Sequence, residues 1–197
     1  MARSFVMTEP ATVNFKKTTM KKLFYPMLAG LLLVSSAFMS VTSQEWKIGD
    51  DHLIKFSSKD PTGTFSSFKG NINFDEADLT KAKFDLTIDV NSIAMGNGMK
   101  NKKALTEEWF DEAKYKTITY VSSAVEKSGD SYKVTGTLKM KGKSKVYPIT
   151  LKFTKTSTGG KFTGTFNVSR KDFGVGKPSE VVPDIMKIDF SVPVTKK

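Results

Sequence analysis

Apolar and polar residues alternate along most of the chain beyond residue 44. In residues 83–90 every second residue is phenylalanine, leucine, isoleucine or valine, and the residues between them are lysine, aspartate or threonine. The same period of two recurs in residues 149–154, 162–168 and 188–194. Because successive side chains of a strand point to opposite faces, each run predicts a strand with one apolar and one wet face, as in antiparallel sheets.

Short turn signals, such as Ser128-Gly129-Asp130 and Thr158-Gly159-Gly160, separate these runs. The sequence contains no internal repeat or low-complexity linker, so one all-β domain over residues 44–197 is the simplest interpretation. Evenly spaced antiparallel strands close as a barrel or stack as a sandwich. The pattern predicts about eight strands, at residues 45–59, 64–75, 82–93, 116–126, 131–141, 145–155, 160–170 and 184–195.

Residues 101–115 break the alternation. This segment, NKKALTEEWFDEAKY, is rich in helix formers. Leu105, Trp109 and Phe110 can share one face of a helix. We therefore predict one short helix between the third and fourth strands, packed over one end of the sheet.

The first 43 residues have the layout of a secretory signal peptide. A basic pair, Lys21-Lys22, precedes an apolar run at residues 27–34, and small residues follow at 41–43. The run is shorter than the roughly 20 residues of a membrane span, which disfavours a membrane anchor. We predict a leader at residues 1–43, with Met20 as an alternative start, and a mature protein in the bacterial periplasm or outside the cell. The absence of cysteine fits a fold without disulfides.

Few residues could carry catalysis. There is no cysteine and a single histidine, His52, which has no partner constellation in view. A structural role for His52 is favoured, and a hydrolase that uses it is the weakest alternative, so we predict no enzyme activity. Zinc sites draw several His or Cys ligands, and we therefore also predict no metal and no cofactor.

The formal net charge is +11 at pH 7. The lysines alternate with threonine and aspartate on the outward side of the predicted strands, which is typical of a solubilising surface. The densest cluster before the predicted helix, Lys100-Asn101-Lys102-Lys103, contains no aromatic residue. Nucleic acids are bound by basic surfaces with interleaved aromatic residues, so we predict no nucleic-acid partner.

The segment RKDFGVG, from Arg170 to Gly176, contains the metal-binding triplet of protein kinases and two glycines. A phosphate-binding glycine loop opens a helix, but another strand is predicted after Pro178, so the nucleotide interpretation fails. Arg170 is the only arginine after position 3. We predict that it pairs with Asp172 or Asp184 and pins a turn over one barrel mouth.

Several short motifs occur in the order found in one known family. They are Asp51-His52, Gly63-Thr64-Phe65, Asn91-Ser92-Ile93, Trp109-Phe110-Asp111, and Arg170 with Asp172-Phe173-Gly174. On these motifs the chain resembles the YceI-like family of exported lipid-binding proteins across residues 45–194. It departs from the family pattern at Lys103, where a histidine is common, at Lys116, where a proline is common, and near Lys59-Asp60, where a second histidine is frequent.

The resemblance implies an eight-stranded antiparallel lipocalin-like barrel that carries a long apolar chain, such as a polyisoprenoid or fatty-acyl lipid, in its lumen. The alternation alone leaves open a solid core, and with it a packed barrel that acts as a stress-related or interaction module. We expect a long-chain lipid or isoprenoid partner, no stable membrane span, and a monomer or homodimer. The expected lumen residues are Phe56, Phe68, Ile72, Phe84, Leu86, Ile88, Ile118, Tyr120, Val134, Leu138, Leu151, Phe153, Phe166 and Phe190.

Overall fold

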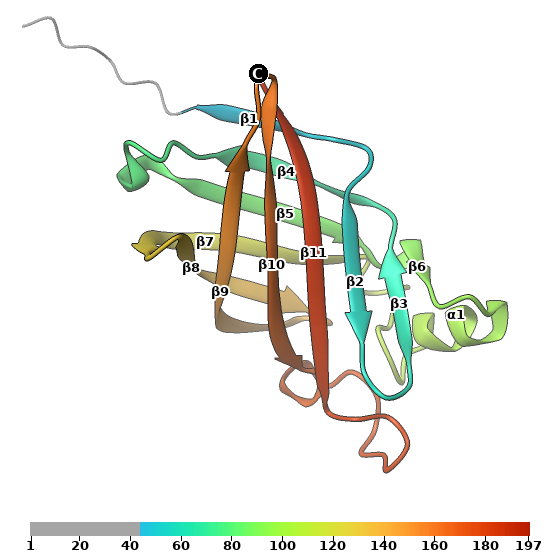
Figure 1. Cartoon of the computed structure of the whole chain (residues 1–197). Helices are drawn as coiled ribbons and strands as arrows, with labels where there is room; N and C mark the ends of the chain where they lie inside the picture. The colour runs from blue at the N-terminus through green and yellow to red at the C-terminus, as the bar shows by residue number, and fades with distance from the viewer. Residues whose placement is uncertain (1–43) are drawn as a thin grey trace, which may run out of the picture. The chain divides into compact units, whose positions relative to one another are not determined.

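The computed structural model describes residues 44–197, so the predicted leader at residues 1–43 lies outside the described residues. The described chain confirms the predicted closed antiparallel barrel of eight long strands with one short α-helix, α1 (Gly98–Leu105), on its flank (Figure 1). The strand segments are β1 (Glu45–Ile48), β2 (Leu53–Ser57), β3 (Thr62–Phe65), β4 (Phe68–Asn73), β5 (Lys83–Asp89), β6 (Ile93–Ala94), β7 (Thr117–Ser128), β8 (Ser131–Met140), β9 (Lys143–Lys155), β10 (Gly159–Ser169) and β11 (Ile185–Lys196).

Three of the long strands are interrupted. β1 and β2 are halves of the first, β3 and β4 of the second, and β5 and β6 of the third, whereas β7 to β11 are continuous. The predictions of unbroken strands in these three places are therefore wrong. Between β5 and β6, the Asp89 side chain accepts a hydrogen bond from the Asn91 amide and caps a 3₁₀ helix, η2 (Val90–Ser92). Such local hydrogen bonds from side chains engage backbone groups that would otherwise pair with a neighbouring strand.

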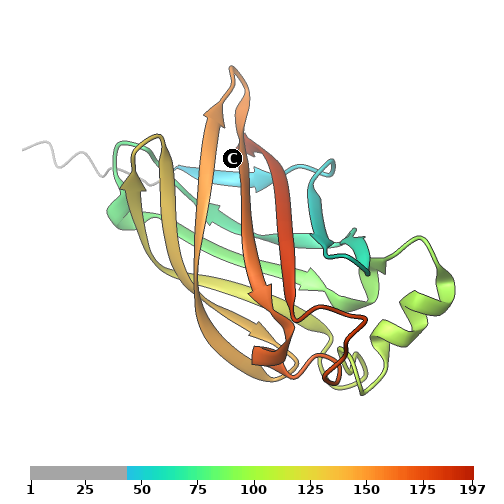
Figure 2. The same cartoon turned by 60° about the horizontal axis from the view of Figure 1, so that its bottom comes forward.

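The last strand closes the barrel. β11 pairs with β10 along nearly its whole length, from Ile185 opposite Ser169 to Thr195 opposite Gly159. Its other edge pairs with β2 and then with β1. Because β1 continues through β4 and β5 to β7, the long strands form one closed wall (Figure 2). Closure places the inward faces of all strands in a single interior.

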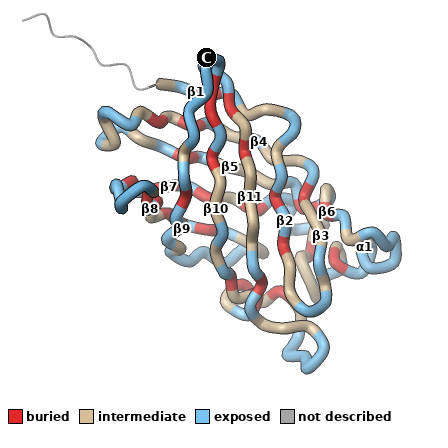
Figure 3. Tube along the Cα trace, in the orientation of Figure 1, coloured by how far each residue is buried: buried red, intermediate tan, exposed pale blue. Residues whose placement is uncertain are grey.

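Burial follows the period of two that the sequence shows (Figure 3). In β8, Tyr132, Val134, Gly136 and Leu138 are buried, and the residues between them are exposed or half-buried. The buried set on this strand is apolar apart from the Tyr132 hydroxyl, which donates to the Glu76 carboxylate at 2.7 Å. The inward face of the strand is therefore suited to a core or to an apolar lumen.

One end of the interior is filled by packed rings, which we call the aromatic plug: Trp46, Phe74, Phe84, Tyr132, Phe153 and Phe162. Phe74 lies at its centre, with ring centroids 4.9 Å from Tyr132 and 5.2 Å from Phe162. The Trp46 indole N–H donates to the Phe74 carbonyl at 2.7 Å. Edge-to-face pairs stabilise by about 0.5–1.5 kcal/mol each beyond their buried area, so this end is firmly closed.

The helix begins and ends earlier than the sequence predicts. α1 starts after Asn97, whose side chain accepts hydrogen bonds from two amides of the first turn, and it ends at the cap residue Thr106. The predicted helix at residues 101–115 is therefore wrong in its second half. Trp109 and Phe110 lie in the turn that follows, and they pack against the core from there. The described residues contain no helix that is long and apolar enough to cross a membrane.

Candidate ligand-binding site

A cavity of about 120 Å³, which we call the inner cavity, lies beside the aromatic plug. Apart from Thr119 and the hydroxyl of Tyr120, its described lining offers no polar side chain. Most of the expected lumen residues line it, namely Phe68, Ile72, Phe84, Leu86, Ile88, Ile118, Tyr120, Val134, Leu138, Leu151, Phe166 and Phe190. The alternation brings these side chains together because every strand turns its apolar face to the same interior.

Further residues that line the inner cavity are missing from the expected set, namely Ile54, Ile149, Phe162, Ile188 and Val192. Phe162, Ile188 and Val192 belong to alternating runs and have the same parity as expected lumen residues on their strands. The period of two was therefore a sufficient signal to find them.

A larger cavity of about 380 Å³, the outer cavity, lies towards the other end of the barrel. It is enclosed by the β2–β3 hairpin, by α1 with the turn after it, and by the loop that follows the 3₁₀ helix η3 (Arg170–Phe173). Figure 1 shows these three segments at the same end of the molecule. The expected lumen residue Phe56 lines this cavity, together with Phe65 and Phe110.

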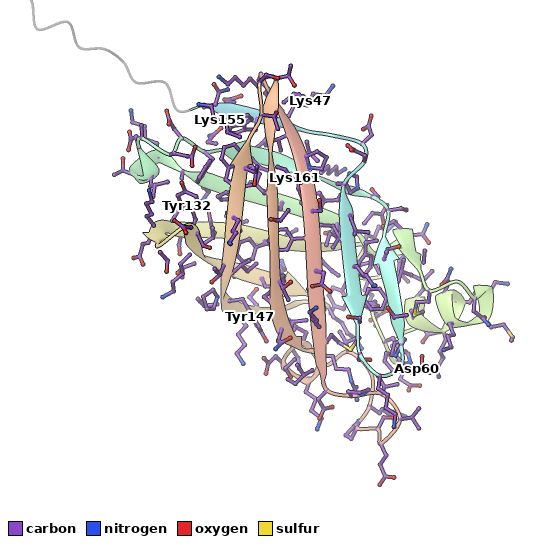
Figure 4. All side chains as sticks on the ribbon, in the orientation of Figure 1. Lys47, Asp60, Tyr132, Tyr147, Lys155 and Lys161 are labelled. Atoms are coloured by element: carbon purple, nitrogen blue, oxygen red, sulfur yellow. The ribbon has the colours of Figure 1, made fainter. Side chains whose placement is uncertain are left out.

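The outer cavity has a charged mouth. Asp60, Lys100 and Lys103 line it and are solvent-exposed, so the cavity opens to water on their side. Asp60 lies at the tip of the β2–β3 hairpin, where Figure 4 labels it. Lys100 Nζ approaches Asp60 Oδ1 at 2.9 Å and thereby ties α1 to the hairpin. The mouth is thus formed by segments that are distant in the sequence.

The two cavities are neighbours. Ile118 on β7 and Ile188 on β11 line both of them, and we call this shared constriction the waist. The interior therefore contains two adjoining apolar cavities, one against the aromatic plug and one that opens to water at the mouth. Such a shape suits a single elongated apolar chain better than a compact molecule.

Phe153 is the expected lumen residue that lines neither main cavity. Its ring packs at 4.6 Å from Phe162 and at 5.3 Å from Trp46, within the aromatic plug. It also borders a third cavity, of about 130 Å³, at the closed end. The alternating run that contains Phe153 predicts correctly that this side chain points inward. It does not predict where the side chain lies along the barrel axis.

Tyr120 and Tyr132 place phenols in the interior without giving it charge. Burial raises the pKa of Tyr120, whose hydroxyl lies 3.0 Å from the carbonyl oxygens of Val134 and Tyr147. Burial and the hydrogen bond to Glu76 raise the pKa of Tyr132 to about 12. Both phenols are therefore neutral at physiological pH and are poor nucleophiles.

Arg170 holds the loop over the outer cavity. Its side chain is 4% exposed, and its guanidinium donates to the carbonyls of Val175, Lys177, Val182 and Pro183 at 2.8–3.1 Å. Nη2 also lies 3.1 Å from Asp184 Oδ1, an ion pair without hydrogen-bond geometry. Of the two expected carboxylate partners, Asp184 is thus the one that Arg170 contacts.

Asp172 joins η3 to β9 instead. Its carboxylate accepts hydrogen bonds from Lys145 Nζ and from the Tyr147 hydroxyl, both at 2.6 Å. These bonds lower the pKa of Asp172 below its ordinary value. The expected pairing of Asp172 with Arg170 is therefore absent from the ion pairs of residues 44–197, because Lys145 and Tyr147 occupy the carboxylate.

His52 has a structural environment. Its ring nitrogens lie 3.0 Å from the Gly49 carbonyl and 3.2 Å from the Ser66 carbonyl, and its ring packs against Phe68. It therefore links the turn between β1 and β2 to the turn between β3 and β4. Within residues 44–197, no group of three or more His, Cys, Asp or Glu side chains is arranged to hold a metal ion.

The family model and the curated relatives that match this chain point to the same family. The model of the YceI-like domain matches residues 39–194. Protein YceI of Salmonella newport (strain SL254) is 29% identical over 184 residues, which cover 82% of this chain and 95% of that protein. Protein YceI of Salmonella arizonae is 30% identical over 139 residues, which cover 64% of this chain and 72% of that protein.

Solved structures share the fold. BcnA of Burkholderia cenocepacia superposes with a TM-score of 0.71 at 29% identity, over 73% of this chain and 96% of BcnA. The YCEI protein of Campylobacter jejuni gives 0.64 at 22% identity, over 72% and 87%. A polyisoprenoid binding domain from Saccharophagus degradans, implicated in plant cell wall breakdown, gives 0.59 at 16% identity, over 77% and 98%. At these identities, the last two structures show the likeness of fold alone.

Proposed function

Because the chain belongs to the YceI-like family, we propose that it is an exported binding protein that holds a long apolar molecule in its barrel. The observation that carries the proposal is the pair of adjoining apolar cavities, one packed against the aromatic plug and the other open to water at the mouth. The polyisoprenoid-binding neighbour supports a ligand of the same chemical class.

The interior can bind an apolar chain, but its side chains do not suggest a catalysed reaction. Each methylene removed from water contributes about 0.8 kcal/mol, so an apolar chain in a narrow apolar space is held without any catalytic group. His52 contacts backbone carbonyls, and the two interior phenols that line the inner cavity and the plug are neutral. We therefore propose a carrier or storage role without a catalytic step.

Native mass spectrometry tests the proposal. Protein purified from its own host should carry a hydrophobic molecule that is released on denaturation, and the emptied protein should take up a lipophilic fluorescent probe. Protein that is empty when isolated and also fails to take up the probe would contradict the carrier function. That result would favour the alternative, a packed barrel that acts as an interaction module. The two cavities speak against this alternative.

Export has its own test. We propose that residues 1–43 are removed and that the mature protein acts in the periplasm or outside the cell. N-terminal sequencing of protein from the periplasmic fraction should begin near Gln44. A stable cytoplasmic protein that begins at Met1 or Met20 would contradict this part of the proposal.

A further inference from the structure

The volume of the two cavities limits the chain that the barrel can hold. An apolar cavity of about 150 Å³ in a protein accommodates one benzene, which corresponds to roughly 25 Å³ per carbon. On this scale the inner cavity of about 120 Å³ holds about five carbons, and the outer cavity of about 380 Å³ holds about fifteen. Both cavities border the waist, so a chain that passes between Ile118 and Ile188 and fills both would have about twenty carbons.

The end of such a chain at the mouth meets positive charge. Lys100 and Lys103 are one helical turn apart on α1, and both line the outer cavity. Asp60 is the acidic residue in this lining, and the guanidinium of Arg170 is already used by backbone carbonyls and Asp184. The side chains at the mouth therefore carry more positive than negative charge.

Both lysines have partners that a ligand can replace. Lys100 Nζ lies 2.9 Å from Asp60, and Lys103 Nζ lies 3.1 Å from Glu108. Three of these four side chains are at least half-exposed and Glu108 is 33% exposed, and exposed ion pairs contribute little to stability. An anion at the mouth can therefore form an ion pair with either lysine, in place of Asp60 or Glu108, without disrupting the fold.

Glu108 has further lysines nearby besides Lys103. The hydrogen bond from Lys103 lowers the pKa of this carboxyl, and the positive charges of Lys103, Lys177 and Lys141 act in the same direction. Lys141 Nζ donates to the Glu108 carbonyl at 3.0 Å. A positive charge therefore stays near Glu108 when Lys103 turns to a ligand.

Trp109 adds a donor that lacks an acceptor. It lines the outer cavity, and its indole nitrogen is buried without a hydrogen-bond partner among residues 44–197. Leaving a buried donor unpaired is unfavourable. An oxygen atom at the polar end of a ligand would satisfy it, whereas a pure hydrocarbon would not.

We propose that the ligand is an amphiphile of about twenty carbons with an anionic head, either a carboxylate or a phosphate, and that Lys100 and Lys103 bind this head at the mouth. The inference rests on the proposed function, because it names the ligand class of the same site. Charge-assisted hydrogen bonds from the lysines favour the anion over the corresponding alcohol.

Displacement of a neutral fluorescent probe, N-phenyl-1-naphthylamine, separates the effect of the head from that of the chain. Phytol, phytenic acid and phytyl phosphate share one branched chain with a single double bond, and they differ in carrying an alcohol, a carboxylate or a phosphate. We expect at least one of the two anions to displace the probe about tenfold more effectively than phytol. The stronger of the two anions identifies which head the site prefers.

The double variant Lys100→Met/Lys103→Met should remove this preference and leave displacement by phytol unchanged. Lys102→Met/Lys116→Met is the matched control, because it removes the same charge from two exposed residues that do not line either main cavity. The control should keep the preference for the anion.

The outcomes separate this inference from the proposed function. Equal displacement by phytol and by both anions in the unmodified protein would overturn the inference and leave a chain-binding barrel. An equal loss of preference in the control variant would also overturn it, since general charge and not the mouth lysines would then be responsible. Failure of the probe and all three phytyl compounds to bind would contradict the proposed function itself.

Discussion

Arg170 shows how a single side chain organises the open end of the barrel. The loop after η3 has no neighbouring strand to satisfy its carbonyls, and the guanidinium supplies the missing donors to four of them. The planar fork of arginine suits this role, which the single ammonium of a lysine could not fill. The ring of Trp109 packs over the same guanidinium, with 5.8 Å between the ring centroid and Cζ.

Arg170→Met should lower the free energy of unfolding by about 3 kcal/mol, because it leaves one buried and three part-buried carbonyls without donors and Asp184 without its buried partner. Urea denaturation followed by tryptophan fluorescence measures the change. Lys171→Met is the control, since Lys171 pairs with the same Asp184 from an exposed position and should contribute less than about 1 kcal/mol. A loss no larger than that of the control would show that the loop does not depend on Arg170.

Asp172 makes the stability of the same end of the barrel depend on pH. Hydrogen bonds from Lys145 and Tyr147 hold its pKa below the ordinary value of 3.8. A carboxyl with a lowered folded-state pKa contributes its full stabilisation above the unfolded-state pKa and loses it as the pH falls through the folded-state pKa. Asp172→Asn should therefore destabilise the protein at neutral pH and have little effect in strong acid. Equal differences in unfolding free energy at both pH values would contradict this.

At the scale of residues, the sequence predicts which way a side chain faces but not how far along the barrel it lies. Phe84 and Phe153 both occupy inward positions of alternating runs, yet Phe84 borders the inner cavity and Phe153 is confined to the plug and the closed end. Axial position depends on strand register and tilt, which arise from pairing between distant strands. For the same reason, the sequence could not choose between Asp172 and Asp184 as the partner of Arg170.

At the scale of elements, the strands were predictable and their interruptions were not. Each long strand buries one face, so its period of two is visible without knowledge of its neighbours. The break at Asp89 and the start of α1 at Asn97 depend on single side-chain caps, which leave a weaker signal. The open end is assembled from such elements. Lys141 Nζ, for example, donates to the carbonyls of Glu108 and Gly174 and links the turn after α1 to the loop after η3.

Asn97→Ala should loosen α1, because an eight-residue helix is marginal by itself and loses a cap worth about 1 kcal/mol. Since α1 covers the outer cavity and carries Lys100 and Lys103, we expect faster amide hydrogen exchange in α1 and faster release of a bound probe. Asn97→Asp keeps the capping oxygen and should behave like the unmodified protein. Unchanged exchange in Asn97→Ala would show that packing, and not the cap, holds the helix.

At the scale of the molecule, the barrel combines a filled end with an adjustable one. The plug is held by ring packing between distant strands, whereas the mouth is held by exposed ion pairs and by bonds from Arg170 and Lys141 to irregular loops. Local opening is easiest where few apolar contacts are lost, so we expect ligand to enter and leave at the mouth. The waist then decides how much of the interior an entering chain can use.

The waist provides the test of a single continuous lumen. Farnesol, with fifteen carbons, matches the outer cavity, whereas phytol, with twenty, also reaches the inner one, and the added carbons contribute at most about 4 kcal/mol. Ile118→Phe narrows the waist, so it should abolish the advantage of phytol over farnesol in probe displacement while farnesol still binds. Ile93→Phe narrows the outer cavity without touching the waist, and should weaken both alcohols alike. If phytol keeps its advantage in Ile118→Phe, its chain does not pass the waist, and the two cavities do not act as one binding site.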